Sequence, residues 1–213
     1  MKRIVYILTS LLLCSAFNAN ARSIMDFFVS EQGELLSLLP KNTRMDMIDY
    51  YNAGRVIEAK NNLGEGTRFN KVTDNYISLQ LTKSCTVEMM LIPVSKKDSV
   101  IIAIKTLELP AKDSEITFYD TNWQPIATKR YFKPASMKDF IRIPKGDKTK
   151  KETVLEAIDF PIVSYTINPD KATIIARHGL SEYMSKEDYK KIKPYLQDSI
   201  NYTLQGHTFK PQR

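Results

Sequence analysis

The sequence is poor in the residues on which many protein sites depend, with two cysteines, two histidines and seven glycines among 213 residues. Cys14 lies in an N-terminal apolar run, so a chain without that run retains only Cys85 and cannot form an intramolecular disulfide. There is no G-x-S-x-G motif, and Gly64-Glu65-Gly66 lacks the lysine and the following helix of a phosphate-binding loop. These absences argue against a disulfide scaffold, a serine hydrolase and a nucleotide-binding protein.

The histidines and the remaining cysteine give no sign of metal or nucleophile chemistry. His178 and His207 lie far apart, with no Cys, Asp or Glu at ligand spacing. Asp120-Thr121-Asn122 matches only the first two ligand positions of a calcium loop, and Trp123 stands where a further oxygen ligand would fall. We therefore expect no metal and no other cofactor, and we interpret residues 120–123 as a hairpin turn that carries a packed indole.

The N-terminus has the pattern of a cleavable export signal. Lys2 and Arg3 precede an apolar run over residues 4–17, and Ala19-Asn20-Ala21 has the small-x-small form of a cleavage site. The run is shorter than the roughly 20 apolar residues of a membrane span, and no later segment is long and apolar enough to be one. We predict cleavage after Ala21 and a periplasmic or secreted protein. Lipidation at Cys14 is the alternative, disfavoured because Leu13 precedes it instead of a small residue.

Removal of residues 1–21 would leave 192 residues and lower the formal charge from +7 to +5. That length suffices for one substantial core, so we predict a single domain over residues 22–213, with room for two related lobes over 22–128 and 129–213.

Alternating apolar and polar residues predict four successive antiparallel strands over residues 76–82, 85–92, 100–107 and 115–120. Shorter strands are predicted over 56–61, 67–72, 162–167, 172–177 and 199–205. Helices are predicted over 23–31 and after apparent capping boxes at Thr43, Thr149 and Ser185. The pattern indicates an α+β fold, an antiparallel β-meander with one buried face and a few short helices packed on one side. Cys85 lies in phase with Val87, so we expect a buried, inert thiol.

Two sets of charged residues are candidates for function. Asp46 and Asp49 lie three residues apart on one predicted helix face, where a capping and solvated role competes with a catalytic one. A basic stretch over residues 128–151 surrounds a predicted hinge at 144–149. If it binds a partner, an envelope glycan or an acidic protein fits better than nucleic acid, because the chain is predicted to be exported; solubility is the other interpretation. The residues that would bind are Lys145, Lys148, Lys150 and Lys151.

Three segments resemble an uncharacterised family of exported Bacteroidetes proteins of about 200 residues: 44–54 (RMDMIDYYNAG), 62–64 (NLG) and 117–123 (TFYDTNW). The resemblance covers nearly the whole chain after the signal and implies an α+β fold and a periplasmic or surface location. It implies no activity and no catalytic residues.

The sequence therefore favours a non-enzymatic binding module of the cell envelope that uses an exposed sheet face or the loops at its end. The alternative is a hydrolase of envelope carbohydrate or peptide whose carboxylates are brought together only by the fold. A deep cleft with two facing carboxyl groups would favour the hydrolase, and a shallow aromatic surface would favour binding.

Overall fold

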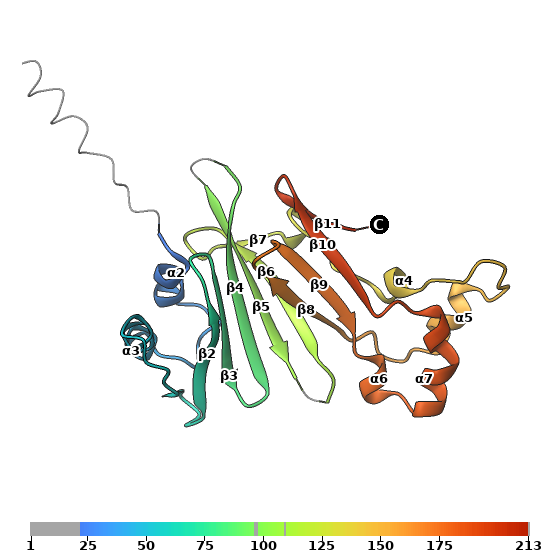
Figure 1. The fold of residues 1–213 in the computed structure, drawn as a ribbon, viewed down its shortest axis with the longest axis horizontal. Coiled ribbons are helices and arrows are strands. Elements are labelled where there is room, and N and C mark those ends of the chain that lie inside the picture. Colours follow the sequence, from blue (N-terminus) through green and yellow to red (C-terminus); the bar gives the residue numbers. More distant parts are fainter. Residues whose placement is uncertain (1–21, 96–97, 109, 213) are drawn as a thin grey trace, which may run out of the picture.

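The computed structural model describes residues 22–95, 98–108 and 110–212, which form two antiparallel sheets and several short helices (Figure 1). The predicted signal, residues 1–21, lies outside the described residues. The helices are α2 (Ile24–Ser30), α3 (Lys41–Asn52), α4 (Met137–Phe140), α5 (Lys151–Glu156), α6 (Leu180–Tyr183) and α7 (Lys186–Ile192), with 3₁₀ turns η1 (Thr128–Arg130) and η2 (Lys193–Tyr195). Among the described residues, no helix is long and apolar enough to cross a membrane.

The larger sheet has seven strands in sequence order. They are β1 (Ala59–Lys60), β2 (Gly66–Val72), β3 (Tyr76–Thr82), β4 (Cys85–Pro93), β5 (Ser99–Leu107), β6 (Asp113–Tyr119) and β7 (Pro125–Ile126). The predicted meander is confirmed, with β3 at its predicted bounds and β4 to β6 within two residues of theirs. The second sheet has the order β11-β10-β9-β8, from β8 (Val163–Asn168), β9 (Thr173–His178), β10 (Ser199–Gln205) and β11 (Thr208–Pro211).

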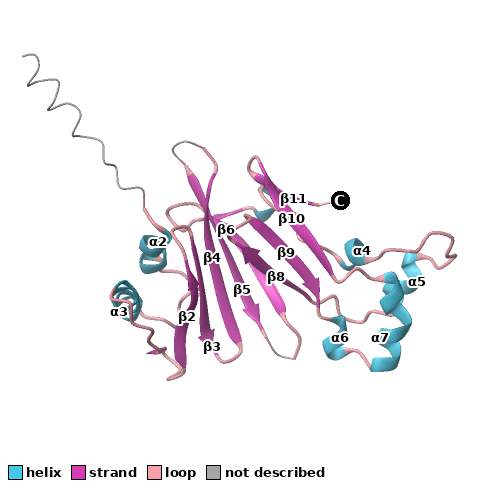
Figure 2. Cartoon of the chain, viewed as in Figure 1, coloured by secondary structure: helices cyan, strands magenta, loops and turns pink. Residues whose placement is uncertain are grey.

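Both faces of the meander are buried in the middle of the sheet, although the alternation predicted only one. On one face Ile77, Leu79, Val87 and Met89 pack against α2, α3 and the loop between them. The opposite face packs against the second sheet, and Phe118 shares that core with its side chains. The helices fall into two groups, α2 and α3 beside the meander and α4 to α7 at the far end (Figure 2). The α+β antiparallel fold is thus as predicted, with a second apolar layer added.

Cys85 is buried among the residues that α2 and α3 cover, as its alternation predicted. Ser185 caps α7 by accepting the N–H of Asp188, which confirms that capping prediction. The segment 56–61 forms only the two-residue strand β1, and the chain has a strand, β11, beyond its predicted last one.

Two predicted capping boxes are wrong, because Thr43 lies inside α3 and Lys150, not Thr149, directly precedes α5. Helix α3 begins at Lys41, directly after Pro40, instead of after Thr43. Helix α5 begins at Lys151. Thr149 lies in the preceding turn, where its N–H donates to the Asp147 carboxylate at 2.7 Å and its hydroxyl to Tyr195 Oη at 3.2 Å.

Candidate functional site

A polar surface opens where the helix-covered face of the meander runs past its helices. β5 and β6 pair so that Ala103 lies opposite Thr117 and Lys105 opposite Glu115. The alternate β6 residues Ile116 and Phe118 point into the core on the other side. Polar residues therefore face outward on β6 because its apolar ones are committed to the opposite face.

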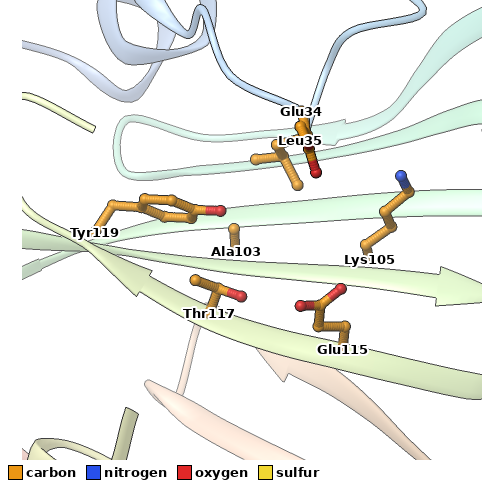
Figure 3. A pocket seen from close by; sticks show the side chains of 7 residues that line it. All are labelled: Glu34, Leu35, Ala103, Lys105, Glu115, Thr117 and Tyr119. Carbon is orange, nitrogen blue, oxygen red and sulfur yellow. The ribbon is translucent and has the colours of Figure 1, made fainter. Parts of the chain in front are cut away.

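These side chains line a shallow hollow of about 110 Å³, which we call the Glu34 hollow. Figure 3 shows Lys105, Glu115, Thr117 and Tyr119 projecting from the sheet and Glu34 entering from the loop above. The small side chain of Ala103 forms the floor. Glu34 and Glu115 are both exposed to solvent. Their oxygens, the ammonium and two hydroxyls give the hollow several hydrogen-bonding groups in a small space.

The loop that carries Glu34 is fixed by a buried arginine. Arg44 of α3 donates from Nη1 to the Phe28 carbonyl at 2.7 Å and from Nη2 to the Glu31 carbonyl at 2.6 Å. The Glu31 carboxylate lies 3.7 Å from the same guanidinium and accepts the N–H of Gly33 at 2.6 Å. Buried charges persist in a fold when they are paired and hydrogen-bonded. This cluster therefore holds the start of the loop beside the sheet.

A larger, open groove of about 470 Å³ adjoins the hollow, and we call it the Trp123 groove. Its lining is mostly polar and comes from three segments: the start of the described chain, the end of α2 with the loop after it, and the β6–β7 turn. The lining residues are Arg22, Ser30, Gln32, Gly33, Thr121, Asn122, Trp123 and Gln124. Three amide side chains and one indole thus surround a single opening.

The β6–β7 turn holds Trp123 in an unusual backbone conformation. Asp120 Oδ1 accepts the N–H groups of Asn122 at 2.8 Å and Gln124 at 2.9 Å. Inside this turn Trp123 has a φ of +62°, which is rare for a bulky residue. The indole is partly exposed, and its Nε1–H donates to Ser30 Oγ at 3.3 Å. Strained backbone of this kind is common at binding sites, where the surrounding structure maintains it.

Tyr119 joins the hollow to the groove. Its ring meets the Trp123 indole edge-on, with 5.2 Å between centroids, and it also lines the hollow. Burial raises the pKa of the Tyr119 hydroxyl, and the carboxylates of Glu31, Glu115 and Glu34 raise it further. The hydroxyl therefore stays protonated at neutral pH and can donate to a ligand.

Arg22 is the charged residue of the groove lining, and its guanidinium already makes contacts within the protein. The guanidinium donates to the Thr121 carbonyl at 3.1 Å and to Ser30 Oγ at 2.8 Å, and it stacks on Phe27 at 4.2 Å from the ring centroid. Among the described residues that line the groove, Arg22 is the single cation, whereas recognition of phosphate usually relies on a cluster of them.

The structure places the four predicted partner-binding lysines elsewhere. Lys145, Lys148 and Lys150 lie on the exposed loop before α5, and Lys151 is the first residue of that helix. None of them lines the Trp123 groove or the Glu34 hollow. Their role in binding a partner remains a prediction.

The other candidate residues, Asp46, Asp49 and His178, lie outside the hollow and the groove. Asp46 and Asp49 are exposed on α3, and neither lines the hollow or the groove. His178 packs edge-on against Phe140, and burial lowers its pKa, so the imidazole is neutral. Within the described part of the chain, no three His, Cys, Asp or Glu side chains gather as a metal site would require.

Glu34, Lys105 and Glu115 line one hollow, but no pattern in the sequence indicates that they are neighbours. They belong to a loop and two strands that are up to about 80 residues apart, so no local spacing relates them. Trp123 was expected to be a packed indole, and it is packed, but its partial exposure beside an open groove has no signal in the sequence.

Comparison with known proteins identifies a family and a fold. Residues 16–209 match the family described as "Protein of unknown function (DUF3256)". A solved structure described as a domain of an uncharacterised protein from Porphyromonas gingivalis W83 is similar, with a TM-score of 0.78 and 22% identity. The similarity covers 90% of this chain and all of that one, and at this identity it supports the fold alone. A search of curated protein sequences finds no significant match.

Proposed function

The chain belongs to the DUF3256 family of proteins of unknown function, and we propose that it is an exported, non-enzymatic module that binds glycans of the cell envelope in the Trp123 groove. Export is supported by the positively charged start, the apolar run over residues 4–17 and the small-x-small sequence that ends at Ala21. These features make the periplasm or the cell surface the compartment in which the groove meets its ligand.

The observation that carries the proposal is the partly exposed indole of Trp123, fixed by its turn at the edge of an amide-lined groove. A sugar ring presents hydroxyl groups around its rim and C–H groups on its faces. Amide side chains both donate and accept hydrogen bonds, and an aromatic side chain offers a rigid apolar surface. Gln32, Asn122 and Gln124 would form hydrogen bonds with the hydroxyl groups of the sugar, and Trp123 would pack against the C–H groups of its face.

The fixed position of Trp123 also favours binding. Ordering a side chain on association lowers the affinity, and a group that is already held in place avoids that loss. The two hydrogen bonds to Asp120 Oδ1 and the indole contact with Ser30 hold the Trp123 turn before any ligand arrives.

A hydrolase is the second candidate, because Glu34 and Glu115 project into one hollow from a loop and a strand (Figure 3). Glycosidases act with two carboxyl groups on either side of the bond that is cleaved. One of the two must remain protonated as a general acid, which enzymes arrange mainly by burial. Both carboxylates are exposed here, and Lys105 shares the hollow with them. This arrangement suits hydrogen bonding to a ligand better than acid catalysis.

The test uses Trp123 as its own reporter, since the chain has a single tryptophan. We expect a soluble oligosaccharide from a panel of neutral, amino-sugar and acidic glycans to shift its fluorescence in a saturable way. By calorimetry, Trp123→Ala should weaken binding by roughly tenfold, or about 1.4 kcal/mol, and Trp123→Phe should retain part of it. Phe160→Ala is the matched control, because Phe160 is an exposed aromatic outside the groove.

Two results would overturn the proposal. If no glycan in the panel binds, or if binding is the same in Trp123→Ala and in Phe160→Ala, the groove is not the site. If the bound oligosaccharide is cleaved and the double variant Glu34→Gln/Glu115→Gln abolishes the cleavage, the protein is a hydrolase instead.

A further inference from the structure

We propose that the outer edge of β2 binds an extended, acidic segment of a partner polypeptide as an added strand. This site lies on the opposite margin of the meander from β6 and β7, and it is independent of the glycan proposal. It rests on three features of the described chain: an unpaired strand edge, an apolar groove beside that edge, and the charge of the residues that line the groove.

The edge is open because β1 is short. β1 pairs with β2 only through Ala59 with Thr67 and Lys60 with Gly66. On the other side, β2 continues to pair with β3 as far as Val72. Within the described part of the chain, residues 68–72 therefore have a strand partner on one side only. Backbone N–H and C=O groups on such an edge are a template for another strand.

An apolar groove of about 190 Å³ lies beside this open edge. The segment 55–57 precedes β1 and forms one wall, the end of β2 forms the other, and Met47 and Tyr51 of α3 contribute as well. Val56 is 93% exposed and Tyr51 is 41% exposed, so apolar surface is left in water. Among the exposed large apolar side chains of the described residues, these two line the groove.

The charge of the groove indicates an acidic occupant. The charged side chains that line it, Arg55 and Lys71, are both basic. Lys71 forms an exposed ion pair with Asp170 at 3.2 Å. Exposed pairs contribute little, so Lys71 can exchange Asp170 for a carboxylate of the occupant. A segment with an apolar side chain for the groove and flanking Asp or Glu residues would satisfy the backbone, the groove and the charges together.

The same charges disfavour a second copy of this chain as the occupant. Pairing of β2 with the β2 of a copy would bring Arg55 and Lys71 of both chains to one small surface, and like charges across a strand pair are destabilising. A bulge between Phe69 and Lys71 also makes the edge irregular. Basic residues and bulges protect an edge from unrelated strands, so the occupant must match this one.

The experiment selects binders to the full chain from a displayed library of random linear peptides. We expect enrichment of peptides with an apolar residue flanked by Asp or Glu. For a synthetic version of an enriched peptide, Val56→Asp and the double variant Arg55→Glu/Lys71→Glu should each weaken binding by at least tenfold. The double variant Lys186→Glu/Lys190→Glu makes the same charge change at exposed positions of α7, far from β2, and should leave the affinity within twofold of wild type.

A second measurement tests the added strand directly and needs no protein variant. In an extended peptide, alternate N–H groups point to opposite edges of the strand. Two peptides are therefore compared, one N-methylated at the odd positions and one at the even positions. The peptide whose methyl groups face β2 should lose binding, and the other should keep it.

The proposal is wrong if no peptide is enriched, or if binding is equal for the two N-methylated peptides. It is also wrong if Val56→Asp leaves the affinity unchanged. A concentration-dependent dimer that Val56→Asp dissociates, measured by light scattering, would show that the occupant is a second copy instead. Glycan binding by the Trp123 groove should be unaffected by the β2 variants, so the failure of one proposal can be distinguished from that of the other.

Discussion

Glu88 is a buried carboxylate that joins the two sheets. From β4 it accepts the hydroxyl of Tyr76 on β3 and the backbone N–H of Ile167 on β8, the latter at 3.2 Å. A buried polar group without partners destabilises a fold, so these hydrogen bonds are needed wherever Glu88 is enclosed. Burial raises the pKa of Glu88, and burial together with the nearby carboxylate raises that of Tyr76.

This burial predicts a pH dependence of stability. Because the pKa of Glu88 is higher in the folded chain than in the unfolded one, the folded state binds the proton more tightly. The resulting stabilisation is complete below the unfolded pKa, about 4.3. It is lost as the pH rises through the folded pKa. Each pH unit between the two values corresponds to about 1.4 kcal/mol.

Glu88→Gln keeps an acceptor oxygen and removes the titration. Between about pH 4 and about pH 8, we expect the free energy of unfolding in urea to fall for wild type relative to the variant. Glu115→Gln, the same change at an exposed strand position, serves as control. Parallel curves for wild type and Glu88→Gln would show that the pKa of Glu88 is not raised by folding.

At the scale of elements, the β6–β7 turn is the piece of structure on which the glycan proposal depends. A left-handed backbone conformation at a residue other than glycine costs roughly 1–2 kcal/mol. Asp120 offsets this cost at Trp123 by accepting two N–H groups of the turn. The stability of the turn and the position of the indole therefore depend on the same carboxylate.

We expect Asp120→Ala to lower the free energy of unfolding by about 1–3 kcal/mol, because two charge-assisted hydrogen bonds are lost. Trp123 should also become more accessible to quenching by acrylamide. Asp98→Ala is the control, since Asp98 lies in another exposed turn, between β4 and β5, where its carboxylate also accepts a hydrogen bond. That variant should leave the quenching unchanged. If the quenching is unchanged in Asp120→Ala as well, then Asp120 does not hold the indole.

The elements themselves show what a sequence can predict. The bounds of β3 and β10 follow from the alternation of apolar and polar residues, because successive residues of a strand point to opposite faces of the sheet. The cap at Ser185 was predictable for the same local reason. The start of α5 was not, because the hydroxyl of Thr149 bonds to Tyr195, 46 residues away.

At the scale of the molecule, the sequence does not predict which elements cover each face of the meander. The alternation of β4 places Val87 on one side and Glu88 on the other, but nothing local says that helices meet the first and a second sheet the second. The Glu34 hollow follows from that arrangement, because the helices stop before β6 and leave Glu115 and Thr117 open. The position of the Glu34 hollow therefore depends on how the layers pack, which no local pattern in the sequence indicates.

The four predicted partner-binding lysines lie outside both proposed sites, on the loop before α5 and at the start of that helix. Lys145, Lys148 and Lys150 are exposed, as is Lys151 at the start of α5. Exposed charges are screened beyond about 8 Å at physiological ionic strength. Substitutions of exposed residues outside packed or bonded positions usually change stability by less than about 0.5 kcal/mol.

We therefore expect reversal of all four lysines to Glu to leave the free energy of unfolding and the affinity for glycan nearly unchanged. Retention on vesicles that carry an anionic glycolipid should fall only as much as it does in a control with four other exposed lysines reversed. That control set is Lys83, Lys171, Lys186 and Lys190. A salt-sensitive loss of retention confined to the first variant, with its fold intact by circular dichroism, would instead make the loop before α5 a partner-binding surface. The control separates the two interpretations because both variants undergo the same change in net charge, so any difference between them must come from where the charges lie.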